Sequence, residues 1–169
     1  MKNTVLRYGV YSAITICALS LAGWFLGKNL DYGIQEVIGY ASMVISLLFV
    51  FFGIKHYRDN ENNGIVSFKK ALLIGVLISL IAALAFGILD VIYVKFINPD
   101  FMAEYYTHYV EQMRNTLSEA DFKVEFEKLE AQKKLFSNIF MSFFLMFATV
   151  LIIGFIISLL SALILQRKP

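Results

Sequence analysis

Four long apolar stretches fill most of this 169-residue chain, at residues 5–26, 37–54, 71–92 and 136–165. A helix needs about 20 mainly apolar residues to cross a hydrocarbon core about 30 Å thick. Water is absent from that core, so each stretch has to satisfy its own backbone hydrogen bonds as a helix. The sequence therefore predicts an all-α integral membrane protein. We expect a four-helix bundle with spans at about residues 5–27, 37–54, 70–94 and 136–165.

Composition agrees with this class and excludes several others. Hydrophobic residues make up 59% of the chain, which is above the range of soluble domains. The length is that of one domain, so residues 1–169 are predicted to form a single membrane domain. A net charge of +2 gives no excess that would indicate a nucleic-acid partner. Cys17 is the only cysteine, so the chain can form neither an internal disulfide nor a cysteine metal cluster.

Basic residues are divided unevenly among the segments between the spans. Short loops rich in Lys and Arg stay on the cytoplasmic side of a membrane. The first loop has only Lys28, beside Asp31 and Glu36. Charges of both signs alternate in the long third segment, and long segments translocate with little regard to charge. Both termini are therefore predicted to be cytoplasmic, on the side of the remaining basic residues: Lys2, Arg7, Lys55, Arg58, Lys69, Lys70, Arg167 and Lys168.

Residues 98–135 leave the membrane but keep a helical pattern. The Asn-Pro-Asp sequence at 98–100 is typical of a helix start. Ser118 begins a capping-box pattern, and the helix after it is predicted to continue without a break into the fourth span. The sequence thus predicts an extracytoplasmic helical hairpin that extends spans three and four.

The first helix of this hairpin carries an aromatic stripe at every fourth position. Such a stripe usually packs inside the protein, here against the second hairpin helix. The alternative is a face for a ligand or for another membrane protein. The stripe consists of Phe101, Tyr105, Tyr109 and Met113, and its predicted counterpart of Phe122, Phe126 and Leu129.

One face of the same helix carries Glu104, His108 and Glu111, which are residue types that ligate metals. The face has a single histidine and no second cluster of ligands nearby. We therefore expect a solvated surface and predict no metal and no cofactor.

Small residues recur at four-residue spacing in the third and fourth spans. Helices in lipid associate by close backbone approach, which small side chains permit. The two spans are therefore predicted to cross closely near the inner membrane surface. The packing residues are Gly75, Ser79, Ala83 and Gly87 in the third span, and Gly154, Ser158 and Ala162 in the fourth.

Asp90 follows Gly87 by three residues, so helical geometry puts it on the small-residue face. A carboxylate inside a membrane span is costly and often functional, which makes Asp90 a candidate for handling protons or cations. The competing interpretation is structural. Asp90 is only about one turn from the outer interface, where a neighbour can satisfy it. The candidates for that neighbour are Lys28, Tyr93, Lys95 and Asn138.

The second loop carries a recognisable pattern. Residues 53–59 read Gly-Ile-Lys-His-Tyr-Arg-Asp, an Asn-Gly turn follows at 63–64, and Ser67-Phe68 begins the next span. Together with the Phe-Ile-Asn-Pro-Asp-Phe segment at 96–101, this pattern resembles domain-of-unknown-function family 4199. Its members, found mainly in Bacteroidota, are predicted four-span inner-membrane proteins. The resemblance implies a bacterial inner-membrane location and this topology, and it carries no catalytic residues.

Within this loop, Lys55, His56, Tyr57 and Arg58 admit two interpretations. They could form a cytosolic contact site for anionic lipid headgroups or for a partner. They could equally be an interfacial anchor, because Tyr prefers headgroup depth and basic residues follow the positive-inside bias.

No nucleotide-binding, zinc-protease or nucleophile-elbow motif is present, so we do not expect an enzyme. The leading hypothesis is a non-enzymatic accessory protein that binds a partner through its outer hairpin or its cytoplasmic loop. The alternative is a small transporter or channel subunit that works as an oligomer, with Asp90 on the pathway. The expected partners are the lipid bilayer and a membrane protein or a second copy of the chain.

Overall fold

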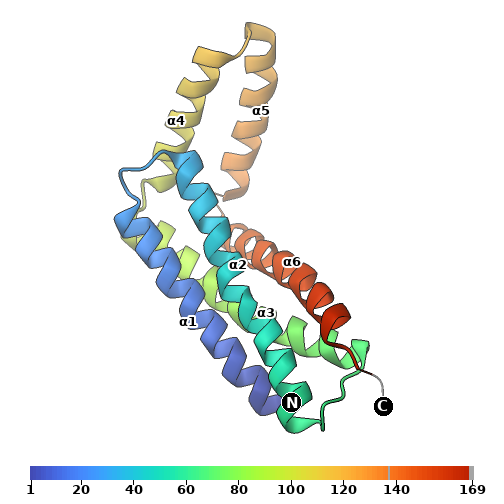
Figure 1. Cartoon of the computed structure of the whole chain (residues 1–169). Helices are drawn as coiled ribbons and strands as arrows, with labels where there is room; N and C mark the ends of the chain where they lie inside the picture. The colour runs from blue at the N-terminus through green and yellow to red at the C-terminus, as the bar shows by residue number, and fades with distance from the viewer. Residues whose placement is uncertain (137, 168–169) are drawn as a thin grey trace. The chain divides into compact units, whose positions relative to one another are not determined.

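The structure, a computed structural model, describes residues 1–136 and 138–167. Its α-helices are α1 (Lys2–Leu26), α2 (Tyr32–His56), α3 (Phe68–Ile92), α4 (Phe101–Thr116), α5 (Glu119–Phe136) and α6 (Ile139–Leu165), shown in Figure 1. Short π-helical segments, Tyr57–Glu61 and Tyr93–Ile97, extend α2 and α3. The chain forms two compact units: Met1–Phe86 with Met146–Pro169, called here the bundle unit, and Gly87–Leu145, called the hairpin unit.

Four helices are long and apolar enough to cross a membrane: Lys2–Leu26, Tyr32–Glu61, Phe68–Ile97 and Ile139–Leu165. Large apolar side chains remain exposed along their lengths, for example Ile14, Ile45 and Ile152. A helix that is apolar on all sides suits lipid rather than water. The described chain is otherwise almost entirely helical, and its one β-bridge joins Val66 to Arg167. The predicted all-α fold is confirmed, and the chain is a multi-pass membrane protein.

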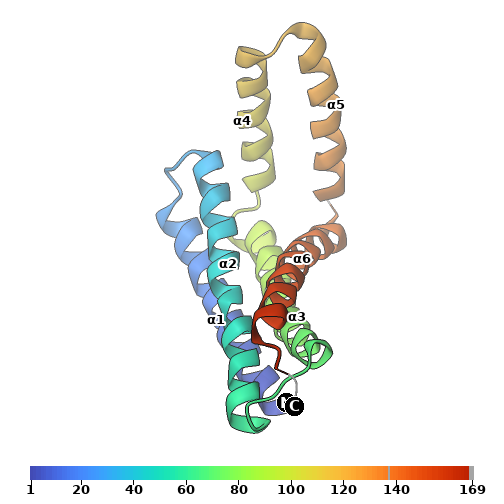
Figure 2. The same ribbon diagram turned by 45° about the vertical axis from the view of Figure 1, so that its right-hand side comes forward.

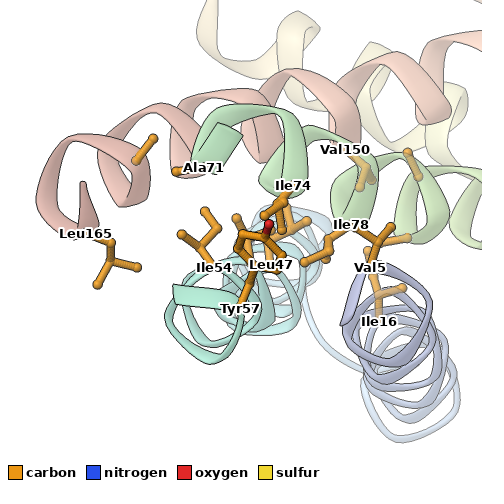
Figure 3. Close-up of a cluster of buried hydrophobic side chains, with 14 of the residues drawn as sticks. Val5, Ile16, Leu47, Ile54, Tyr57, Ala71, Ile74, Ile78, Val150 and Leu165 are labelled. Carbon is orange, nitrogen blue, oxygen red and sulfur yellow. The ribbon is translucent and has the colours of Figure 1, made fainter. Parts of the chain in front are cut away.

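The core of the bundle unit consists of aliphatic side chains from all four of its helices. Leu47 and Ile54 of α2 meet Ile74 and Ile78 of α3 in the centre, and all four are fully buried (Figure 3). Ile16 of α1 and Val150 of α6 are buried in the same cluster. Because lipid tails are as apolar as these side chains, the cluster stabilises the bundle through close packing rather than through exclusion of water.

The second membrane helix begins earlier than the apolar stretch suggests. Its first residue is Tyr32, five positions before the predicted start at 37. The cause is a cap: the Asp31 carboxylate accepts a hydrogen bond of 2.8 Å from the backbone N–H of Gly33. The added turn of α2 is polar, with Gln35 and Glu36, and hydropathy alone therefore missed it.

The prediction of one continuous helix from the hairpin into the fourth span was wrong. Helix α5 ends at Phe136 and α6 begins at Ile139. The side-chain oxygen of Asn138 accepts hydrogen bonds from the backbone N–H groups of Phe140 (3.0 Å) and Met141 (3.4 Å), so Asn138 caps a new helix. Ser137 lies outside the described residues.

Two other predicted helix starts appear where the sequence indicated them. The Ser118 hydroxyl accepts a hydrogen bond of 3.3 Å from the backbone N–H of Asp121, which caps α5. Helix α4 begins at Phe101, directly after the Asn-Pro-Asp segment. The hairpin is therefore helical on both sides, as predicted, and α4 and α5 lie side by side in it.

Candidate functional site

The loop between α2 and α3 is held in one conformation by its own backbone. Asn63 and Gly64 both have positive φ angles, 54° and 79°. These values reverse the chain, and Gly64 has no Cβ to oppose the turn. The backbone N–H of Gly64 then donates to the carbonyl of Arg58 at 2.8 Å, and that of Ile65 donates to the carbonyl of Asn62 at 3.1 Å. The loop is a closed turn rather than an open linker.

Arg58 lies inside this turn rather than on its surface. Only 7% of the residue is exposed. Its guanidinium donates two hydrogen bonds to the Asp59 carboxylate, at 2.6 and 3.0 Å, and a third, at 3.3 Å, to the backbone carbonyl of Leu165. Leu165 is the last residue of α6, whose final carbonyls lack partners within the helix. Arg58 therefore caps α6, and its side chain is not placed to contact a headgroup.

Two backbone hydrogen bonds complete this connection between the loop and the end of α6. The N–H of Val66 donates to the carbonyl of Arg167 at 3.2 Å, and the N–H of Arg167 donates to the carbonyl of Val66 at 2.9 Å. On the other side of the loop, the Thr4 hydroxyl of α1 donates to the Glu61 carboxylate. The beginning of α1, the loop and the end of α6 therefore lie together at one end of the bundle unit (Figure 2).

The four loop residues singled out in the sequence do not form one surface. Tyr57 is buried, and its hydroxyl donates to the Asn62 side chain at 3.4 Å. Lys55 is exposed. His56 is half-buried, and its ring lies 5.6 Å from the ring of Tyr8 in α1. The structure thus separates two internal residues, Tyr57 and Arg58, from two that face outward or toward α1.

The small residues of the third and fourth spans meet directly within the bundle unit. A Cβ atom added to Gly75 would lie 2.6 Å from the Ser158 hydroxyl, and one added to Gly154 would lie 2.5 Å from the Cβ of Ser79. The two serine hydroxyls are 3.5 Å apart, and each also donates to a carbonyl of its own helix. Two further members of the set, Ala83 and Ala162, are fully buried.

Asp90 belongs to the hairpin unit and is half-buried there. Its carboxyl group accepts a hydrogen bond of 3.1 Å from the hydroxyl of Ser142, a buried residue of α6. Close by, a Cβ added to Gly87 would lie 2.9 Å from the Phe143 ring. The partner is thus the neutral hydroxyl of Ser142, which was not among the four neighbours that the sequence suggested. A serine facing a single acid from a distant helix leaves no signal in one sequence.

A family model described as "Protein of unknown function (DUF4199)" matches residues 7–167. The chain belongs to this family. Comparisons with curated proteins and with solved structures found no match. The match confirms the resemblance seen in the loop and at residues 96–101, and it includes every candidate residue described above. It assigns none of them a role.

The hairpin of this DUF4199 member is held together by a residue that the sequence analysis missed. The Tyr106 ring lies 6.2 Å from the Phe126 ring, and the Lys133 ammonium lies 4.0 Å from the centre of the Tyr106 ring. The Tyr106 hydroxyl donates to the Glu130 carboxylate, which raises the pKa of the phenol above its ordinary value. Tyr106 follows Met102 by four residues and precedes Met113 by seven, and this spacing could have identified it.

The predicted aromatic stripe forms a row of touching rings along α4. Ring centres are 5.6 Å apart between Tyr93 and Phe101, 6.2 Å between Phe101 and Tyr105, and 4.4 Å between Tyr105 and Tyr109. The three rings of α4 are each partly exposed. Within the described residues, no three His, Cys, Asp or Glu side chains converge as a metal site requires.

Proposed function

We propose that this protein is a non-enzymatic accessory protein of a bacterial inner membrane. In this proposal both termini are cytoplasmic, the α4–α5 hairpin is extracytoplasmic, and the hairpin binds a partner protein. The observation that carries the proposal is the thin packing of the hairpin, because its helices bury too little of themselves to be stable alone.

No residue of α4 is buried, and none of α5 is buried between Glu119 and Lys134. Isolated helices of 12–15 residues are marginal in water, and most helices in proteins are stabilised by burying one face. Between the two helices, Tyr106 contacts Phe126 and Glu130, and the Arg114 guanidinium lies over the Phe122 ring. A partner that covered the partly exposed ring row of α4 would supply the missing burial.

The chemistry of the row indicates the kind of partner. Tyr side chains combine a large apolar ring with a hydroxyl, and they are enriched in protein interfaces. Glu104 and Glu111 of α4 are exposed beside the row. The complementary surface is therefore apolar with a basic rim, on another membrane protein or on a second copy of this chain.

The proposed orientation rests on the basic end of the bundle unit. Arg7, Lys55, Lys69 and Lys70 are all exposed at the end where the loop meets the start of α1. Basic residues next to membrane spans are retained on the cytoplasmic side. This assignment makes the segment between the third and fourth spans extracytoplasmic.

A transporter or channel subunit with Asp90 on its pathway is the less supported alternative. The Asp90 carboxyl group is satisfied by Ser142 from another helix, and a hydrogen bond between helices is a common structural use of polar side chains in membranes. An assembly of several copies would be needed to build a pathway from a single acid per chain.

The test is site-specific photocrosslinking in living cells, with the photoreactive residue placed at Glu111. We expect one discrete adduct, either with a partner or with a second copy of the chain. The matched control is the same residue at Glu119, at the far turn of the hairpin. The charge reversal Glu111→Lys should weaken co-purification of the crosslinked protein, whereas Glu119→Lys should not. The absence of a specific adduct from every position of the hairpin would refute the proposal.

A further inference from the structure

A cluster of aromatic and basic side chains lies between the beginning of α1 and the end of α2. Ring centres are 5.9 Å apart for Tyr8 and Tyr11, 5.6 Å for Tyr8 and His56, and 5.8 Å for Tyr11 and Phe49. The guanidinium of Arg7 lies 5.8 Å from the centre of the Tyr8 ring and 5.7 Å from that of Tyr11. We call these five residues, Arg7, Tyr8, Tyr11, Phe49 and His56, the aromatic-basic cluster.

The backbone of the bundle unit fixes this cluster in place. An added Cβ at Gly53 would lie 3.2 Å from the Cβ and Cγ atoms of Tyr8, so the glycine lets Tyr8 pack tightly onto α2. One turn further along α1, the Ser12 hydroxyl donates a hydrogen bond of 2.8 Å to the carbonyl of Ser46. Contacts between α1 and α2 at Gly53 and at Ser12 therefore fix the positions of the tyrosine rings.

Arg7 is exposed, and its charge is not neutralised by the protein. Its Nε donates to the Tyr11 hydroxyl at 3.1 Å, and its guanidinium lies over the Tyr8 and Tyr11 rings. Within the described part of the chain it forms no ion pair with a carboxylate. Glu61 of the loop is paired with the N-terminal ammonium at 2.6 Å and accepts the Thr4 hydrogen bond, so it does not pair with Arg7. The remaining guanidinium donors have the planar geometry that binds phosphate.

Exposed apolar side chains continue from the cluster along both helices. Val10 and Ile14 follow Arg7 on its face of α1, with exposed fractions of 45% and 62%. Ile45 and Phe52, on the face of α2 that includes Phe49, are 52% and 51% exposed. In a membrane protein such rows face acyl chains. A cation at one end of these rows matches a molecule with an anionic head and apolar tails.

We propose that the aromatic-basic cluster binds the phosphate group of an anionic phospholipid, whose acyl chains lie along the apolar rows of α1 and α2. Arg7 is the principal donor, and the Tyr11 hydroxyl holds its guanidinium in place. The site uses Arg7 rather than the loop residue Arg58, which is occupied internally. It is independent of the hairpin, so its failure would leave the partner proposal unaffected.

The test uses the full chain in phosphatidylcholine nanodiscs that contain phosphatidylglycerol with the same acyl chains. Native mass spectrometry after mild extraction measures the phosphatidylglycerol retained on each chain. We expect preferential retention of the anionic lipid, and Arg7→Gln should weaken it at least about fivefold, since one basic residue near anionic lipid contributes roughly that factor. Tyr11→Phe should weaken retention less, and it carries the test if Arg7→Gln does not fold.

The control is Lys69→Gln, which removes the same charge from an exposed residue at the start of α3, outside the cluster. It should leave retention unchanged. Equal losses in Arg7→Gln and Lys69→Gln would show general charge attraction and overturn the proposal. So would equal retention of phosphatidylcholine. Excess glycerol phosphate should not displace the lipid, and displacement would assign the cluster to a soluble phosphate instead.

Discussion

Single residues in this protein have roles that their positions in the sequence do not reveal. Arg58 follows the basic pattern of a cytoplasmic loop and was interpreted as a possible contact for headgroups. In the structure it is buried and bonded to Asp59 and to the last carbonyl of α6. Arg7, which the sequence marked only as one basic residue among eight, is the exposed cation of the aromatic-basic cluster. Which of two arginines is internal depends on contacts between distant segments, and hydropathy carries no information about these.

The internal role of Arg58 predicts that its removal lowers the stability of the protein more than removal of the nearby exposed Lys55 does. Arg58→Ala would leave the Leu165 carbonyl without its side-chain donor and should lower the free energy of unfolding by about 1.5–3 kcal/mol, the range for hydrogen bonds to charged groups. Lys55→Ala, at an exposed position, should change it by less than about 0.5 kcal/mol. Thermal unfolding in detergent measures both. Equal unfolding temperatures for the two variants would contradict the internal role of Arg58.

At the scale of elements, the sequence predicted the features of the helices that the bilayer determines, namely their length and their apolar character. Span length and apolar character follow from the thickness of the membrane, so four membrane-length helices were foreseeable. The break between α5 and α6 was not, because the apolar pattern continues across it while a single side chain, Asn138, caps a new helix. In the hairpin the sequence drew attention to the aromatic row, and it missed the contacts of Tyr106 with Phe126 and of Arg114 with the Phe122 ring.

The close crossing of α3 and α6 in the bundle unit predicts that a single methyl group added at the crossing lowers the stability of the protein. Gly75→Ala places a Cβ 2.6 Å from the Ser158 hydroxyl, which is itself held by the Gly154 carbonyl, so the helices have to separate. Overpacking of this kind costs about 1–3 kcal/mol. Gly39→Ala is the matched control, because nothing lies within 4 Å of its added Cβ. It should be neutral or slightly stabilising, and similar thermal unfolding of the two variants would argue against the crossing.

At the scale of the whole molecule, the proposed roles of the hairpin and of the lipid site depend on which side of the membrane each segment occupies. Four spans place the beginning of α1, the α2–α3 loop and the end of α6 on one side. The network around Arg58, Glu61 and Val66 joins these three segments, in agreement with that topology. In the proposed topology the hairpin is extracytoplasmic. The lipid site and the partner-binding hairpin would act in different compartments.

Cysteine accessibility in intact cells tests this topology most directly. In a Cys17→Ser background, single cysteines would be placed at Asn115, exposed in the hairpin, and at Asn60, exposed in the loop. A membrane-impermeant maleimide should label the cysteine at 115 in intact cells, after the outer membrane is permeabilised where one is present. It should label the cysteine at 60 only after the inner membrane is opened. Labelling of residue 60 with protection of residue 115 would contradict the account.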